Sequence, residues 1–213
     1  MYLLPYRRDS DGVAGMLDIA TGRFYESAED TFLTGNEVKL TDDHEIIEAV
    51  SFNGDKIFSA CVIRSDYIIE SMFARTKTDK TVYLYGYVTS PHTKSVTAYM
   101  GSNSAWRWGS AYANHNTQNT NIHYAVHQNG SVRLDLTAKS FTALTFETDD
   151  TLIVGGYRSS GGVPNYQFVG KIYSFRVMDA NGDYVVDWLP CRRKSDGVEG
   201  FWDSVSQSFI EPI

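Results

Sequence analysis

The stretch from Gly101 to Tyr124 gathers side chains that can recognise a ligand. Trp106, Arg107 and Trp108 follow one another in it. Flat aromatic faces stack on the apolar C–H patches of sugars, and a guanidinium donates hydrogen bonds to hydroxyl groups. The same stretch supplies further ring, amide and imidazole groups: Tyr112, Asn114, His115, Asn116 and Asn119. This composition predicts a ligand-binding site and suits a glycan.

A second stretch carries similar groups. Tyr157, Arg158 and Tyr166 flank a segment rich in serine and glycine, and we predict that this loop lies beside the first stretch at one end of the fold. An alternative stays open for both stretches. Two Trp residues at positions i and i+2 share one face of a strand and can belong to the core, and a polar loop can be simply solvated.

Groups suited to catalysis are sparse. Glycan-cleaving enzymes use two carboxylates about 5–10 Å apart, but Glu70 and Glu147 are the only glutamates between residues 49 and 188. The sequence contains no Gly-x-Ser-x-Gly elbow, and neither cysteine has a neighbour suited to activating a nucleophile. We therefore predict no catalytic residue and a protein that is not an enzyme.

The histidines and cysteines do not form a metal-binding pattern. His115, His123 and His127 are close along the chain, but no further ligand accompanies them with the spacing of a zinc site. Cys61 and Cys191 are too few for a disulfide framework, so we predict two free thiols. The sequence predicts no metal ligand and no cofactor.

Residues 179–183 (DANGD) imitate the start of a calcium-binding loop. Tyr184 stands where such a loop needs glycine, and Pro190 stands where it needs the closing glutamate. The Asn-Gly step inside the segment is typical of a hairpin turn instead. We predict a hairpin at this position.

These candidate residues belong to a chain that reads as one strand after another. Short segments rich in Val, Ile, Tyr, Phe and Thr alternate largely between apolar and polar residues, and no segment has a sustained helical period. The predicted strands are 46–52, 56–63, 67–74, 81–88, 94–100, 121–127, 131–136, 139–146, 151–157, 167–178 and 184–189. Many strands without crossover helices predict an all-β fold, a two-sheet antiparallel β-sandwich of the jelly-roll type.

An internal repeat indicates how the chain is organised. LPYRRDSDGVAG at residues 4–15 recurs as LPCRRKSDGVEG at residues 189–200. The match continues to Phe24 and Phe209, with 11 of 21 aligned positions identical at a constant offset of 185 residues. A domain-ending element is therefore present twice. We predict a tail-like arm over residues 1–40 and a sandwich over residues 41–213. Either the chain belongs to a tandem array, or its arm packs on something else.

The repeated segment also carries a family resemblance. Residues 170–177 (GKIYSFRV) and 187–198 (DWLPCRRKSDGV) resemble the end of laminin-G-like, concanavalin A-like jelly-roll modules. Such modules occur in phage and prophage structural proteins and in bacterial surface proteins. Residues 47–54 and 67–73 are similar to the first sheet strands of that family. The resemblance implies a binding or spacer module, and it leaves calcium at the rim of the sandwich open.

Charge narrows the choice of partner. The chain has 19 Lys and Arg against 26 Asp and Glu, a net charge of −7, which argues against nucleic acid because such binding needs a basic face. No apolar stretch is long enough to insert into a membrane. We expect a noncatalytic module on the virion surface of a phage (tail or head) or on a bacterial cell surface, recognising a host glycan or other cell-surface ligand. The alternative is a structural decoration or fibre protein whose arm, residues 1–40, mediates assembly with a neighbouring virion protein or a second copy.

Overall fold

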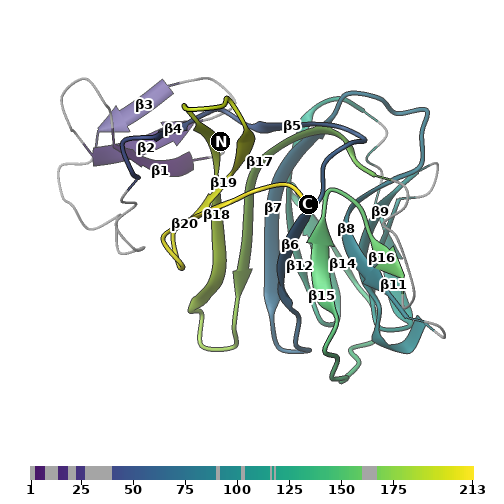
Figure 1. Ribbon diagram of the computed structural model, residues 1–213. Helices are drawn as coiled ribbons and strands as arrows, with labels where there is room; N and C mark the ends of the chain where they lie inside the picture. Colours follow the sequence, from purple (N-terminus) through teal and green to yellow (C-terminus); the bar gives the residue numbers. More distant parts are fainter. Residues whose placement is uncertain are drawn as a thin grey trace. The chain divides into compact units, whose positions relative to one another are not determined.

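The computed structural model divides the chain into two compact units, Met1–Lys39 and Leu40–Ile213 (Figure 1). It describes the backbone of residues 3–7, 14–18, 23–26 and 92, and it describes residues 40–89, 93–101, 104–115, 117, 119–159 and 167–213 in full. Apart from a short 3₁₀ turn, η2 (His92–Lys94), every regular element in the described part is a β-strand. The all-β prediction is confirmed.

The first unit contains a small antiparallel meander. Its strands are β1 (Leu3–Arg7), β2 (Ala14–Asp18) and β3 (Arg23–Glu26), in the order β1-β2-β3.

The second unit is a sandwich of two sheets. The larger sheet runs β14 (Thr137–Ser140), β13 (Ser131–Leu134), β12 (Ile122–Gln128), β7 (Ile68–Arg75), β17 (Val169–Met178), β18 (Tyr184–Arg193), β19 (Glu199–Asp203) and β20 (Ser208–Ile210). Two short strands also pair with strands of this sheet: β4 (His44–Ile46) pairs with β18, and β5 (Val50–Asn53) pairs with β17. All of these pairings are antiparallel.

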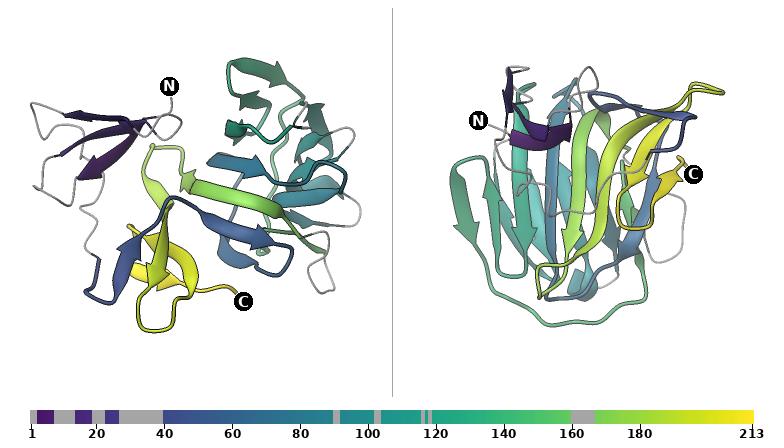
Figure 2. Two further views of the ribbon diagram at one scale, coloured as in Figure 1. Left: turned by 90° about the horizontal axis from the view of Figure 1, so that it is seen from above. Right: turned by 90° about the vertical axis from the view of Figure 1, so that its left-hand side faces the viewer.

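The smaller sheet carries most of the predicted site residues. It runs β11 (Ala111–Asn114), β10 (Ala105–Trp108), β9 (Val96–Met100), β8 (Val82–Val88), β15 (Thr151–Val154) and β6 (Phe58–Val62). A two-residue strand, β16 (Arg158–Ser159), pairs with β8 in parallel, whereas the other pairs are antiparallel. The two sheets form the two layers of Leu40–Ile213 (Figure 2), so the antiparallel sandwich predicted from the sequence is confirmed.

Aromatic side chains fill the space between the layers. Phe73 and Phe175 from the larger sheet meet Tyr85 and Trp106 from the smaller one, with no exposed surface on any of the four. These strands form because side chains alternate between their faces, and the large rings on the inner faces remove a continuous apolar area from water. The core thereby fixes which residues of each strand point outward.

Several predicted boundaries differ from the structure. The predicted strand 139–146 is regular only as far as Ser140, and residues 141–150 have no regular structure. No strand is predicted between residues 100 and 121, but the structure has the hairpin β10–β11 there. Its turn uses Gly109, which has a φ of +63°. The residue before this glycine is Trp108, so the sequence has no Asn-Gly step to mark the turn. Among the described residues, no helix is long and apolar enough to cross a membrane.

Candidate functional site

The β10–β11 hairpin divides the predicted ligand residues between its two faces. Trp106 and Trp108 point inward and have no exposed surface. Arg107 lies between them on β10 and therefore faces outward, opposite Tyr112 of β11, which is 53% exposed. The hairpin therefore exposes to solvent the face that Arg107 and Tyr112 share.

The prediction that the two Trp side chains contact a ligand is wrong. Trp106 packs edge-on against Tyr85 at 6.1 Å, and Trp108 packs edge-on against His127 at 5.1 Å between ring centroids. Both belong to the core, which is the alternative that the sequence left open. Replacing a buried Trp with Ala typically costs about 3–5 kcal/mol of folding free energy. Binding lost in such a variant would therefore report damage to the fold.

The outward residues of the smaller sheet form two rows. The pairing register places Tyr112, Arg107, Thr97 and Gly86 side by side across four neighbouring strands. The Arg107 guanidinium lies 5.4 Å from the centre of the Tyr112 ring, in a cation–π contact. The row ends at Gly86, which has no side chain. A Cβ at this position would lie 2.9 Å from Thr97 Cγ2, which is closer than such atoms normally approach.

The second row lies two residues away along β9, β10 and β11, and three residues away along β8, where a bulge intervenes. Asn114, Ala105, Tyr99 and Tyr83 are adjacent by register. The Tyr83 ring lies 5.1 Å from the Tyr99 ring and 4.4 Å from the Tyr157 ring. Three half-buried tyrosines thus form one contiguous aromatic group beside the arginine.

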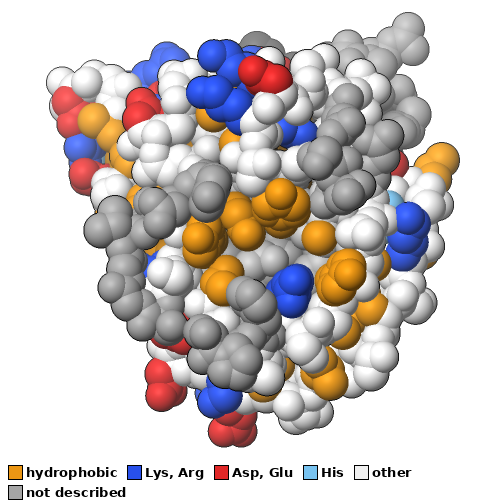
Figure 3. Space-filling model, turned by 90° about the vertical axis from the view of Figure 1, so that its right-hand side faces the viewer, with side chains coloured by type: hydrophobic (Ala, Val, Ile, Leu, Met, Phe, Trp, Pro, Cys, Tyr) orange, Lys and Arg blue, Asp and Glu red, His pale blue; other side chains and the backbone are white. Residues whose placement is uncertain are grey.

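We call this surface the tyrosine strip. It consists of Tyr83, Tyr99, Arg107, Tyr112, Asn114 and Tyr157. Figure 3 shows the side on which β8, β9, β11 and β16 lie in Figure 1, and there side chains of the hydrophobic class, which in this figure includes tyrosine, gather around a basic side chain. The strip combines flat rings with a guanidinium and an amide, which are the groups that bind sugars by stacking and hydrogen bonding.

The remaining predicted site residues have other surroundings. His115 is buried, its N–H donates to the Ser104 carbonyl at 3.0 Å, and burial lowers its pKa. The Asn119 side chain supports its own loop, since its Oδ1 lies 2.8 Å from the Asn121 N–H nitrogen and 2.9 Å from His123 Nε2. Arg158 is exposed on β16, one residue after Tyr157 of the strip. The predicted residues Asn116 and Tyr166 lie outside the described residues.

Sequence reasoning missed two members of the strip, Tyr83 and Tyr99. Both lie in segments predicted as strands, so their element was known in advance. Tyr83, Tyr85 and Tyr87 alternate along β8, and a bulge between Tyr83 and Tyr85 shifts the register, so the alternation alone does not tell which rings face outward. The signal available was the unusual number of tyrosines in adjacent strands.

Potential metal ligands have other contacts. Among the described residues, no group of three His, Cys, Asp or Glu side chains could hold a metal ion. His123 Nδ1 lies 2.8 Å from Asp135 Oδ2, and His127 is buried with its Nδ1 3.0 Å from the Tyr85 hydroxyl. Burial lowers the pKa of His127 to about 3.

Two smaller predictions are confirmed. Residues 179–183 form a hairpin turn, in which Asp179 Oδ1 accepts the N–H groups of Asn181 and Asp183. These hydrogen bonds lower the pKa of Asp179. Cys61 and Cys191 are free thiols, and burial raises their pKa to about 12 and about 11, which keeps both protonated at neutral pH.

No family model and no curated protein matches this chain. The tyrosine strip therefore has to be interpreted from its own geometry.

Proposed function

We propose that the sandwich is a noncatalytic binding module that recognises a host glycan or other cell-surface ligand through the tyrosine strip, on a phage particle or a bacterial surface. The observation that carries the proposal is the pair of outward rows on the smaller sheet. They place tyrosine rings, one guanidinium and one amide on a single face of a rigid sheet. The laminin-G-like resemblance supports the setting.

A glycan is the ligand class that this surface suits best. Sugars present apolar C–H patches that stack on aromatic rings, and hydroxyl groups that exchange hydrogen bonds with arginine and asparagine. Arg107 has no carboxylate partner among the described residues, because its one contact is the Tyr112 ring. Its donors are therefore free to bind oxygen atoms of a ligand.

The test is a binding screen of the protein against bacterial polysaccharides and whole cells, beside two paired variants. One removes the strip pair by Arg107→Ala and Tyr112→Ala. The matched control carries Arg133→Ala and Tyr124→Ala on the other sheet. There the Arg133 guanidinium lies 5.9 Å from the centre of the Tyr124 ring, in a second cation–π contact. We expect the strip variant to lose at least tenfold in affinity and the control variant to bind as the parent does.

Circular dichroism and thermal unfolding of both variants check that each is folded. Equal binding by the strip variant and the parent protein would contradict the proposal, and so would an equal loss in both variants. Absence of binding to every polysaccharide and cell tested would also reject it.

A further inference from the structure

The internal repeat of the sequence is also a repeat of backbone pairing. Each residue pair that joins β18 to β19, or β19 to β20, has a counterpart 185 residues earlier in β1–β3. Pro5 pairs with Met16 as Pro190 pairs with Phe201, for example. We call β1–β3 the first meander and β18–β20 the closing meander. The same hairpin lengths and the same register make the two structurally equivalent.

The identical residues are those that build the meander itself. In the closing meander Arg193 pairs with Asp196 at 2.6 Å and with Glu211, and its guanidinium lies 5.3 Å from the Phe209 ring. Gly197 completes the turn with a φ of +73°. All five residues recur in the first meander, as Arg8, Asp11, Gly12, Phe24 and Glu26. The sequence of the first meander therefore retains the residues that make contacts within the closing meander.

The residues that face the rest of the sandwich have changed. Trp188 and Phe201 lie in the core with Ile210 packed against them, and Trp188 stacks on Phe201 at 5.1 Å. Their register counterparts are Leu3, Met16 and Tyr25. All three are apolar, but their sizes differ from those in the closing meander. Because protein cores are close-packed, this pattern indicates that the first meander packs against a different body, by which we mean the remaining strands of a sandwich, whose core has a different shape.

A buried polar contact has changed in the same way. Ser204 Oγ donates to Asp187 Oδ2 at 2.6 Å, and Asp187 also pairs with Arg176 of β17 at 2.8 Å. The first copy has Ile19 and Tyr2 at the positions of Ser204 and Asp187. Both members of the contact are replaced together, so a body that fits the first meander needs no arginine at the position of Arg176.

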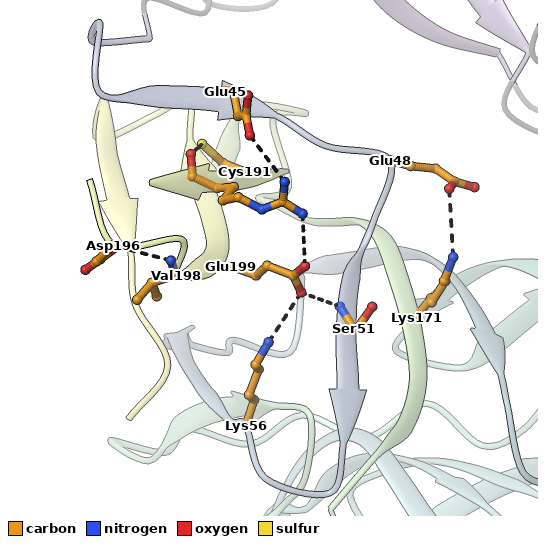
Figure 4. Close-up of polar contacts among 10 residues, drawn as sticks. Glu45, Glu48, Ser51, Lys56, Lys171, Cys191, Asp196, Val198 and Glu199 are labelled. Carbon is orange, nitrogen blue, oxygen red and sulfur yellow. Dashed lines mark hydrogen bonds and ion pairs between the residues drawn. The ribbon is translucent and has the colours of Figure 1, made fainter. Parts of the chain in front are cut away.

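Arg192, which recurs as Arg7, contacts a strand outside its own meander. Arg192 lies between two carboxylates, Glu199 of β19 at 3.4 Å and Glu45 of β4 at 3.3 Å, in the network around Glu199 (Figure 4). Its counterpart is Arg7, but Ala14 occupies the position of Glu199. The position equivalent to Glu45, on the strand across the other edge, is therefore the one from which an acid would reach Arg7.

The matching place in Leu40–Ile213 is already filled. β18 pairs there with β17 and β4, so the closing meander occupies the edge that a second meander would need. In the described part of the first unit, β1 pairs with β2 and with no other strand. A sheet with an apolar face has to bury that face against another layer.

We propose that residues 3–26 are the closing meander of a second β-sandwich, built like Leu40–Ile213 but with its own core, whose other strands come from polypeptide outside this chain. The partner is a sandwich with a vacant edge equivalent to β17 and β4, carrying an acidic residue opposite Arg7. The chain thus joins the end of one module to a whole module.

The first test compares the two meanders by hydrogen exchange in the monomeric full chain. The matched strands are β2 and β19, each the central strand of its meander. We expect amides in β2 to exchange at least about 100-fold faster than those in β19, because the first meander lacks its body. Equal protection in a monomer would overturn the proposal, since the meander would be closed within the chain. Protection that arises only in a dimer would overturn it too, with a second copy as the occupant.

The second test supplies a body. In a tandem chain, residues 40–187 are joined directly to residues 3–213, so Leu3 follows Asp187 as Trp188 does. A second version carries Leu3→Trp, Met16→Phe and Tyr25→Ile. These substitutions give the first meander the core residues of the closing meander, Trp188, Phe201 and Ile210, so that it fits the strands of residues 40–187. We expect the β2 amides to become protected in one or both versions, and a Met16→Asp control to abolish that protection. If β2 exchanges as fast in both tandem chains as in the free chain, the proposal is wrong.

Discussion

At the scale of single residues, His127 is the clearest case of burial controlling a charge. It lies among Tyr85, Trp106 and Trp108, and burial lowers its pKa from 6.5 to about 3. The folded protein therefore keeps this imidazole neutral, whereas the unfolded chain takes up a proton below pH 6.5. The neutral His127 ring therefore makes its full contribution to the unfolding free energy above pH 6.5, and that contribution is lost as the pH falls toward 3.

This dependence is testable with His127→Gln, which removes the titrating ring. Between pH 7.5 and pH 5.0, we expect His127 to account for about 2 kcal/mol of the parent's loss in unfolding free energy. The variant should lose that much less over the same interval. Urea unfolding at the two pH values measures the difference. His115, whose pKa burial also lowers, contributes equally to both proteins. An identical pH dependence of parent and variant would show that His127 is not the group responsible.

At the scale of elements, the sequence was sufficient for the fold class and for most strands, because long alternating segments carry a strong signal. It was insufficient for the β10–β11 hairpin, whose strands have four residues each and whose turn lacks an Asn-Gly step. It was also insufficient for the site. Whether Trp106 or Arg107 faces the core depends on pairing and packing with strands distant in sequence, which alternation within one strand does not define.

The Gly109 turn positions both faces of that hairpin, and Gly182 offers a matched comparison. Both glycines have positive φ, at +63° and +86°. A Cβ at Gly109 would lie 2.9 Å from Leu144 Cδ1, whereas a Cβ at Gly182 would have nothing within 4 Å. We expect Gly182→Ala to cost about 1 kcal/mol from backbone strain alone, and Gly109→Ala to cost about 1 kcal/mol more from crowding. Urea unfolding of both variants measures the two costs, and equal costs would contradict the crowding argument.

At the scale of the whole molecule, the division into two units predicts how the chain responds to truncation. All four Trp residues lie in Leu40–Ile213, so intrinsic fluorescence reports the unfolding of that unit alone. This sandwich already has its own closing meander. Removing residues 1–39 should therefore change its unfolding free energy by less than about 0.5 kcal/mol, within the range of changes away from packed features.

Removing residues 208–213 is the contrasting truncation, because it deletes β20 from the closing meander. Ile210 packs against the core there, and the Ile213 N–H donates to the Ile57 carbonyl at 2.9 Å. Losing the Ile210 side chain, the Phe209 ring that packs on His44, and the pairing of β20 should cost at least about 2 kcal/mol. If the short deletion is harmless and the long one destabilises the sandwich, the two meanders have exchanged roles, and residues 1–39 belong to the fold of Leu40–Ile213 after all.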